Sequence, residues 1–329
     1  MKKILIIYTG GTIGMHKDHS GSLKPFDFGK VTEQVPELKH LNCTLHHYAF
    51  KNLIDSSNVT PSFWQELVEV IKKNYSKHDG FVILHGSDTM SFTASALSFM
   101  LENLSKPVIL TGSQLPIGII RTDGKENLIT AIEIAAAQKN KKPVVTEVCV
   151  YFEYKLYRGN RTYKYNSAHF DAFKSPNYPA LAEAGVNIQY NTTALLKPGK
   201  KSLSVHTHLE NDIAVLKLFP GLSKKITLAI LNTPGIKAVI IETFGAGNAS
   251  TEEWFIKALK NAIDKGIIIY NVTQCAEGKV IQGMYETSSA LKKIGVISGF
   301  DITFESAITK LMFVLGQKVS LSKAKQLLE

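Results

Sequence analysis

The feature that most constrains the fold is a series of short apolar runs bounded by glycine, proline or aspartate. They are Ile4–Tyr8, Phe81–Leu84, Val108–Leu110, Val144–Val150, Ile213–Leu218, Ala238–Ile241 and Ile267–Val272. Runs of this length suit strands that are buried on both faces, as in a parallel sheet. We therefore expect the chain to build at least one such sheet.

Helix-length segments lie between several of these runs. They are Phe63–Tyr75, Asn127–Gln138, Glu253–Ile263 and Ser306–Leu315, and their apolar residues recur with the helical period. The first of them follows Thr60-Pro61-Ser62, which is a helix start signal. Strands that alternate with helices predict an α/β fold with right-handed crossovers.

A change of composition predicts two domains. Residues 188–211 are rich in Asn, Thr, Pro, Gly, Lys, His and Ser and have weak periodicity, although a strand could lie among them. We expect a larger N-terminal domain with a mainly parallel sheet over residues 1–188, a linker over 189–211, and a smaller C-terminal α/β domain over 212–329. A chain of 329 residues is long enough for both.

Composition and charge exclude several classes of protein. With 44% hydrophobic and 20% charged residues, the chain is not of the disordered type. Its net charge of +10 is spread over scattered lysine pairs, which favours a solvated surface over a nucleic-acid-binding arm. No run approaches the length of a membrane span, and the apolar start is too short for a signal peptide. The three cysteines form no CxxC or metal-binding spacing, so we expect a reducing, cytoplasmic location.

Three loops rich in hydroxyl groups and glycine follow three of the predicted strands. They are Thr9–Gly14, His85–Thr89 and Thr111–Gln114. Because the carboxyl ends of parallel strands meet at one edge of a sheet, these loops are expected to share a pocket.

Each loop also has a simpler interpretation. The first lacks the G-x-G-x-x-G and P-loop patterns, which disfavours a nucleotide site. Its glycines could present Thr12 to a ligand, or Thr12 could only cap the next turn. Ser87 and Asp88 could likewise cap the helix that follows, or Asp88 could bind an ammonium group. We interpret His85, at the end of a buried strand, as structural.

At these residues the sequence resembles the bacterial asparaginase/glutaminase family, specifically its cytoplasmic type I L-asparaginases. The family's T-G-G-T-I-G signature is Thr9–Gly14, and its H-G-T-D-T-M signature is His85–Met90 with one change. Further matching stretches are Asp55–Ser57, Leu97–Lys106, Thr111–Gln114, Leu156–Arg161, Phe170–Asn177, Gly245–Asn248 and Asn271–Cys275. The resemblance covers nearly the whole chain.

The resemblance implies hydrolysis of L-asparagine to L-aspartate and ammonia, with no metal or cofactor and with L-glutamine as a second substrate to be tested. It implies that Thr12 is the nucleophile and that Ser87, Asp88 and Lys164 form a second catalytic group. Asp88 would also hold the substrate's α-ammonium group. The family's substrate-binding positions correspond here to Asp55, Ser56, Ser57, Ser87, Asp88, Ser113 and Asn248, with Ser56 at the α-carboxylate. Asn248 would reach a neighbouring subunit's site in a homo-oligomer, a dimer or tetramer.

Four positions depart from the family pattern. Ser87 replaces the family's second catalytic threonine, so the hydroxyl is kept and the methyl group that restricts χ1 is lost. The segment Gly21–Pro25, a candidate lid, lacks the family's tyrosine, for which Lys24, Tyr8 or a neighbouring element could substitute. Tyr163 and Glu242 stand where some type I enzymes have a threonine and an arginine for a regulatory asparagine. We therefore predict no regulation by asparagine.

Two other functions are compatible with the same residues. The chain could be an ammonia-donating subunit that acts on charged tRNA, in which case it would bind tRNA in a salt-sensitive manner. It could also be an amino-acid binder without catalysis, which would bind asparagine tightly and leave it intact.

Overall fold

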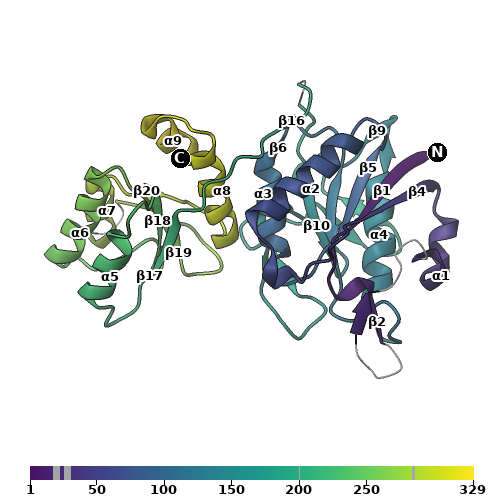
Figure 1. Ribbon diagram of the computed structural model, residues 1–329, viewed down its shortest axis with the longest axis horizontal. Coiled ribbons are helices and arrows are strands. Elements are labelled where there is room, and N and C mark those ends of the chain that lie inside the picture. The colour runs from purple at the N-terminus through teal and green to yellow at the C-terminus, as the bar shows by residue number, and fades with distance from the viewer. Residues whose placement is uncertain (18–22, 26–30, 200, 284–285) are drawn as a thin grey trace. The chain divides into compact units, whose positions relative to one another are not determined.

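The computed structural model describes residues 1–17, 23–25, 31–199, 201–283 and 286–329 (Figure 1). The chain forms two compact units, Met1–Thr207 and His208–Glu329.

The N-terminal unit is built on a sheet whose described strands run in the order β15-β14-β11-β10-β7-β5-β1-β4. Their bounds are β1 (Lys2–Tyr8), β4 (Cys43–Ala49), β5 (Gly80–Leu84), β7 (Val108–Thr111), β10 (Val148–Phe152), β11 (Lys155–Arg158), β14 (Ala182–Ala184) and β15 (Ile188–Tyr190). The strands from β10 to β4 are parallel, whereas β10, β11, β14 and β15 pair antiparallel, each with the next. This confirms the mainly parallel sheet that the apolar runs predict.

Helices cover both faces of this sheet (Figure 1). They are α2 (Pro61–Asn74), α3 (Met90–Met100) and α4 (Gly124–Ala136), and the short α1 (Val31–Gln34) precedes β4. Leu128 and Ile132 of α4 share a buried cluster with Val82 of β5. Phe81, which points to the opposite face of the same strand, stacks on Tyr75 at the end of α2. The alternation of side chains along β5 therefore serves two helical layers.

Short paired strands connect these elements. They are β2 (Met15–Lys17) with β3 (Leu23–Pro25), β6 (Leu101–Glu102) with β16 (Ser204–Val205), β8 (Gln138–Lys139) with β9 (Lys142–Pro143), and β12 (Tyr163–Lys164) with β13 (Phe173–Lys174). The apolar run that starts at Val144 becomes a strand only at Val148, because the Val144 amide donates a hydrogen bond to the Ala137 carbonyl in the turn after α4.

The C-terminal unit has a parallel sheet in the order β17-β18-β19-β20. Its elements are β17 (Ile213–Lys217), α5 (Lys224–Leu231), β18 (Ala238–Thr243), α6 (Glu253–Asp264), β19 (Ile268–Thr273), α7 (Glu286–Ile294), β20 (Ile297–Ser298), α8 (Phe304–Gly316) and α9 (Leu321–Leu328). Alternate strand residues enter two separate buried clusters: Val239 packs with Phe255 of α6, and Ile240 packs with Leu311 of α8. The unit is therefore a smaller α/β layer structure, as expected.

The first unit extends beyond the predicted limit at residue 188. Strand β15 lies where the linker is expected and pairs with β14 of the large sheet. Strand β16 pairs with β6, which follows α3, and the unit ends at Thr207. These pairings join residues far apart in the chain, so local composition does not reveal them. None of the helices in the described ranges combines the length and apolar character that a membrane crossing requires.

Candidate active site

The loops after β1, β5 and β7 meet at the carboxyl edge of the large sheet, as the sequence predicts. The Thr9 amide donates to the Leu84 carbonyl at 3.1 Å, and the His85 amide donates to the Thr111 carbonyl at 2.9 Å. Gly11 has φ +86°, and a Cβ atom there would lie 2.5 Å from the Gly86 nitrogen. Only glycine allows this approach of two backbones. The close contact of Gly11 with Gly86 therefore brings the loops that carry Thr12 and Ser87 together.

Thr12 begins the 3₁₀ turn η1 (Thr12–Gly14), is partly exposed, and follows Gly11 at the N-cap position. Within the described part of the chain its hydroxyl group makes no hydrogen bond, so Thr12 does not cap this turn. The turn is supported from below by Tyr8, whose buried hydroxyl donates to the Gly14 carbonyl at 3.0 Å. As far as the described residues go, the Thr12 hydroxyl is thus available to a ligand.

Tyr8, one of the proposed substitutes for the lid tyrosine, is buried beneath the Thr12 turn. Its side chain is 1% exposed, its hydroxyl bonds to Gly14, and burial raises its pKa to about 12. The candidate lid, Gly21–Pro25, lies partly outside the described residues, as does the Lys24 side chain.

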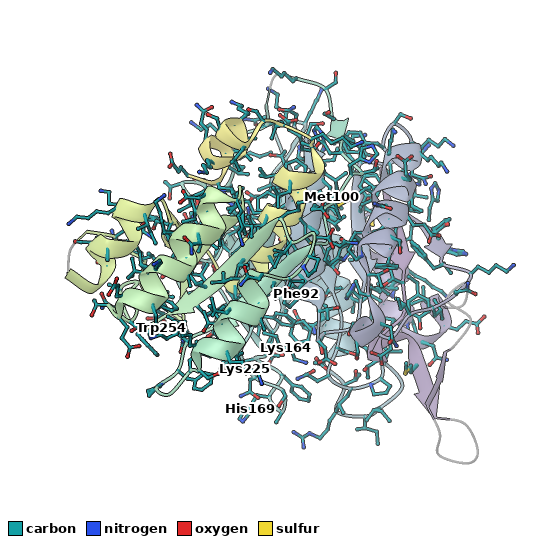
Figure 2. All side chains as sticks on the ribbon, turned by 60° about the vertical axis from the view of Figure 1, so that its left-hand side comes forward. Phe92, Met100, Lys164, His169, Lys225 and Trp254 are labelled. Atoms are coloured by element: carbon teal, nitrogen blue, oxygen red, sulfur yellow. The ribbon has the colours of Figure 1, made fainter. Side chains whose placement is uncertain are left out.

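Ser87, Asp88 and Lys164 form a hydrogen-bonded cluster. Lys164 Nζ lies 2.7 Å from Ser87 Oγ and 2.8 Å from Asp88 Oδ1. Lys164 comes from β12, and Figure 2 places it at the Phe92 end of α3, away from Met100. The N-cap of α3 is Thr89, so Ser87 and Asp88 face the lysine instead of capping the helix. The Lys164 side chain is 14% exposed and that of Asp88 66%, which leaves the carboxylate accessible to a cationic ligand group.

Ser56 is placed beside the same loop. It begins the 3₁₀ turn η4 (Ser56–Asn58), is 4% exposed, and its carbonyl accepts the Thr89 hydroxyl at 2.7 Å. A Cβ atom on Gly86 would meet the Ser56 hydroxyl at 2.5 Å. Asp55 caps this turn by accepting the amide and hydroxyl of Ser57, and these hydrogen bonds lower the pKa of the Asp55 carboxyl. Asp55 and Ser57 thus hold the turn that presents Ser56.

The two remaining candidates are placed differently. Ser113 is buried, and its hydroxyl donates to the Leu115 carbonyl at 2.5 Å, which turns it toward its own loop. Asn248 belongs to the C-terminal unit, where its backbone forms a bridge with Phe244.

Two groups in this region were given no role by the sequence. Gln114 accepts a hydrogen bond from the Ser87 hydroxyl at 3.2 Å. The buried carboxylate of Asp123 accepts the amides of Gln114 and Leu115 and so fixes the loop after β7. The available signals were the Thr111–Gln114 stretch and the position of Asp123 immediately before a helix.

His85 is a structural residue in a buried chain of hydrogen bonds. Trp64 Nε1 donates to Thr93 Oγ1 at 2.9 Å, and the Thr93 hydroxyl lies 2.9 Å from His85 Nε2. His85 Nδ1 donates to the Gly86 carbonyl at 2.7 Å. Since that carbonyl only accepts, the hydrogen is on Nδ1 and the neutral ring accepts from Thr93. Burial lowers the pKa of His85 to about 4.

We expect His85 to make the N-terminal unit acid-sensitive. An unfolded histidine titrates near pH 6.5, whereas the folded pKa is about 4. The unfolded state therefore binds the proton first as the pH falls, and stability is lost between these two values. The full difference is about 3 kcal/mol. Denaturant unfolding, followed by Trp64 fluorescence in a Trp254→Phe background, measures it.

The matched variant is His85→Asn, which keeps a donor near the Gly86 carbonyl but does not titrate. Its stability should fall less steeply with pH than that of the parent between about pH 7 and pH 5, where the carboxyl groups contribute equally to both. Equal slopes would show that His85 is not the titrating group.

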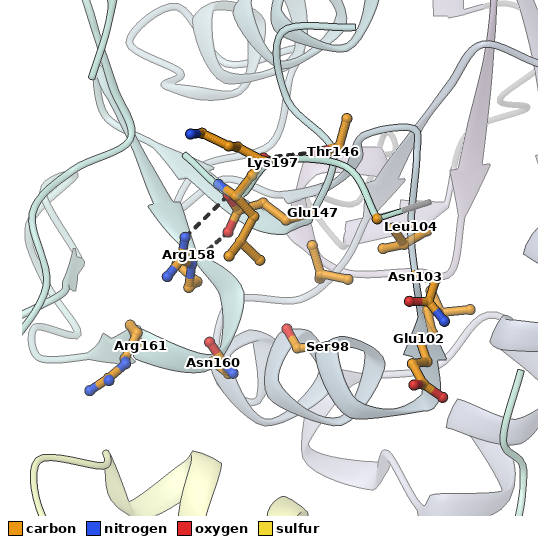
Figure 3. A pocket seen from close by; sticks show the side chains of 14 residues that line it. Ser98, Glu102, Asn103, Leu104, Thr146, Glu147, Arg158, Asn160, Arg161 and Lys197 are labelled. Atoms are coloured by element: carbon orange, nitrogen blue, oxygen red, sulfur yellow. Dashed lines mark hydrogen bonds and ion pairs between the residues drawn. The ribbon is translucent and has the colours of Figure 1, made fainter. Parts of the chain in front are cut away.

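Cavities lie both beside and away from this cluster. One of about 600 Å³ is lined by Gln114, Ile119, Phe170 and their neighbours. Another, of about 520 Å³, is bordered by the start of β10 and the end of α3 (Figure 3). There the buried Glu147 carboxylate accepts Arg158 Nε at 2.6 Å. This ion pair lies at the amino end of β10, whereas the catalytic candidates follow the carboxyl ends of neighbouring strands. In the described residues, no group of three or more His, Cys, Asp or Glu side chains could hold a metal ion.

The fold and the cluster define an α/β protein with a hydroxyl-rich site at the carboxyl edge of its main sheet. Two family models match the chain: "Asparaginase, N-terminal" over residues 3–196 and "Glutaminase/Asparaginase C-terminal domain" over residues 212–328. The chain belongs to the asparaginase family and is a hydrolase of that class.

Three similar proteins illustrate the relationship. Escherichia coli (strain K12) L-asparaginase 1 is 44% identical, over 97% of this chain and 93% of its own. The 60 kDa lysophospholipase of Mus musculus is 39% identical, over 99% of this chain and 61% of its own length. The crystal structure of L-asparaginase I from Vibrio cholerae has a TM-score of 0.91 at 42% identity, covering 100% of this chain and 97% of that one. The family resemblance noted in the sequence is confirmed.

Proposed function

We propose that this protein hydrolyses L-asparagine to L-aspartate and ammonia through an acyl-enzyme on Thr12. The observation that carries the proposal is the approach of the Thr12 loop to the Ser87–Asp88–Lys164 cluster through Gly11 and Gly86. The similarity to the E. coli and V. cholerae L-asparaginases supports this choice of substrate.

The chemistry requires two transfers of the acyl group. The Thr12 oxygen attacks the amide carbon, its proton passes to the leaving nitrogen, and the C–N bond breaks to release ammonia. Water then attacks the ester and regenerates the threonine. The Lys164 ammonium beside Ser87 stabilises the deprotonated form of that hydroxyl and so makes it more acidic. Backbone amides of the glycine loops would stabilise the oxyanion.

Charged groups at both ends would hold the substrate. We assign the α-ammonium group to Asp88 and the α-carboxylate to Ser56, whose turn Asp55 and Ser57 support. Ser113 shapes the loop after β7, where its hydroxyl bonds to the backbone. Fixing both ends of a small zwitterion aims its side-chain amide at Thr12, and such positioning lowers the barrier by several kcal/mol.

The same proposal extends to assembly and location. We infer a homo-oligomer, a dimer or a tetramer, in which Asn248 contributes to a neighbour's site. We place the protein in the cytoplasm, with L-glutamine as a candidate second substrate and no nucleic-acid or membrane partner. A sedimentation measurement of mass tests the homo-oligomer, and an ammonia assay tests L-glutamine as a substrate.

We expect a hyperbolic dependence of velocity on asparagine concentration. Glu242 occupies the position where a regulatory carboxylate would need an arginine, and its own carboxylate lies 3.6 Å from Lys217 Nζ. Two carboxylates repel, so asparagine should not bind there. Steady-state rates over a wide concentration range give the answer, and a Hill coefficient clearly above one would contradict the prediction.

The proposed reaction is tested with the purified protein. Ammonia release is measured with L-asparagine, L-glutamine and D-asparagine, and fatty acid release with a lysophospholipid. An acid-quenched reaction is then digested, and the peptide that contains Thr12 is searched for an aspartyl ester. Turnover of L-asparagine with the ester on Thr12 supports the proposal. Tight binding of asparagine without turnover, or hydrolysis of the lysophospholipid alone, would refute it.

A further inference from the structure

Gln114 connects Ser87 to the chain segment that follows Lys164. Its Oε1 atom accepts the Ser87 hydroxyl at 3.2 Å, and its Nε2 atom donates to the His169 carbonyl at 3.1 Å. Figure 2 marks Lys164, the last residue of β12, and His169, which lies on the connection from β12 to β13. The Gln114 side chain thus joins the loops after β5 and β7 to this connection.

The orientation of the Gln114 amide follows from its partners. A backbone carbonyl such as that of His169 only accepts hydrogen bonds, so the Gln114 atom facing it must be Nε2. Oε1 therefore faces Ser87, and the Ser87 hydroxyl must be the donor. The Lys164 ammonium only donates, so it donates to a lone pair of Ser87 Oγ at 2.7 Å. Both the hydrogen and a lone pair of Ser87 are thereby directed.

The Ser87 side chain has no methyl group to fix its rotamer. A threonine at this position has a second heavy atom on Cβ, which limits χ1, whereas a serine loses more rotamer freedom when it is fixed. We propose that Gln114 is a positioning residue for Ser87, and that its hydrogen bond supplies the restraint that the absent methyl group would give. The proposal rests on the proposed function, because it assigns Ser87 to the reaction.

The backbone of Gln114 is fixed by hydrogen bonds, which the positioning role requires. Its backbone amide donates to both oxygens of the buried Asp123 carboxylate, at 3.1 and 2.9 Å. Asn127 Nδ2 donates to the Gly112 carbonyl at 3.0 Å and so holds the start of the same loop. The loop is therefore anchored to α4 before the side chain reaches Ser87.

The far end of the Gln114 amide has an ordered partner as well. Asn166 Oδ1 accepts the amides of Ala168 at 2.8 Å and His169 at 3.0 Å, which shapes the turn that presents the His169 carbonyl. Asn166 follows Lys164 by two residues. Through this turn, Gln114 is connected to the segment that follows Lys164, the other residue that contacts Ser87.

A double-mutant cycle between positions 87 and 114 tests the proposal. The variants are Gln114→Met, which keeps the length of the side chain but forms no such hydrogen bond, Ser87→Thr, and the double variant. In the parent protein, Gln114→Met should lower kcat about tenfold and leave KM within about twofold, as expected for a lost positioning hydrogen bond. In the Ser87→Thr background the same change should lower kcat less than about threefold, because the methyl group then fixes the rotamer.

Gln317→Met is the matched control. Gln317 Nε2 also donates to a histidine carbonyl, that of His208, at 3.1 Å, but it lies at the end of α8 in the C-terminal unit. This variant should keep the parental kcat, and melting temperatures of all variants report any general loss of stability.

The possible outcomes separate the inference from the function on which it rests. An equal loss of kcat in the serine and threonine backgrounds would overturn the inference, as would an unchanged kcat in Gln114→Met. A parent protein without activity on asparagine would refute the proposed function itself, before the cycle is measured. Rescue of Gln114→Met by Ser87→Thr would support the inference, because a purely structural role of Gln114 would not depend on the methyl group at residue 87.

Discussion

Thr12→Val should lower kcat for L-asparagine by at least about 10⁴-fold, because valine keeps the shape of threonine but has no nucleophile. The change should cost little stability, since within the described residues the Thr12 hydroxyl has no hydrogen-bond partner to lose. Steady-state ammonia release measures the loss, and single-turnover mass spectrometry should find no aspartyl ester in this variant.

Thr12→Ser provides the comparison, because it keeps the oxygen and loses only the methyl group. We expect it to retain measurable turnover and to form the ester. Calorimetric titration with L-aspartate should give similar affinities for both variants and the parent, since the proposed clamp consists of Ser56 and Asp88. Turnover of Thr12→Val above about one per cent of the parental rate would exclude the threonine mechanism.

The central sheet could be predicted because its strands have a simple chemical signature. Ile4–Tyr8 and Phe81–Leu84 are apolar throughout and lie between helical layers, so every residue of the run is buried. The loops that follow such strands lie at one edge by topology alone. The meeting of the Thr9–Gly14 and His85–Thr89 loops was therefore accessible from the sequence.

The role of Lys164 could be predicted only through the family resemblance. Lys164 lies on β12, which is two residues long and has no periodicity to detect. Nothing in the residues near Lys164 indicates that its amine meets Ser87, which lies 77 positions earlier in the chain. The backbone contact between Gly11 and Gly86 is equally hidden, because a glycine indicates that space is needed without naming the partner.

The strands within the predicted connection were hidden for a related reason. Residues 188–211 have the composition of a connection, yet β15 and β16 lie within this stretch and pair with β14 and β6. The β16 pairing closes a loop of about a hundred residues, which a local pattern cannot reveal.

Lys164→Met should lower kcat by about 10³-fold, the second largest effect we expect. The lysine is the cation that lies within 2.8 Å of both Ser87 Oγ and Asp88 Oδ1, and its side chain is only 14% exposed. Methionine keeps most of the apolar stem but removes the charge, so Ser87 loses the cation that stabilises the deprotonated form of its hydroxyl. Lys174→Met, on the paired strand β13, is the matched control and should keep the parental kcat, since Lys174 Nζ lies 3.9 Å from the Tyr165 ring centroid.

A charge effect can be separated from a loss of structure by chemical rescue. In Lys164→Ala the shortened side chain leaves room for a small cation, so added methylammonium should restore part of kcat in a saturable manner. A lysine that only supported the fold would not be replaced by a free amine. Because Asp88 also loses its cation in either variant, KM for asparagine should change less than kcat if the substrate's own ammonium group takes that place. A large rise in KM with an unchanged kcat would instead assign Lys164 to substrate binding and remove it from the chemical step.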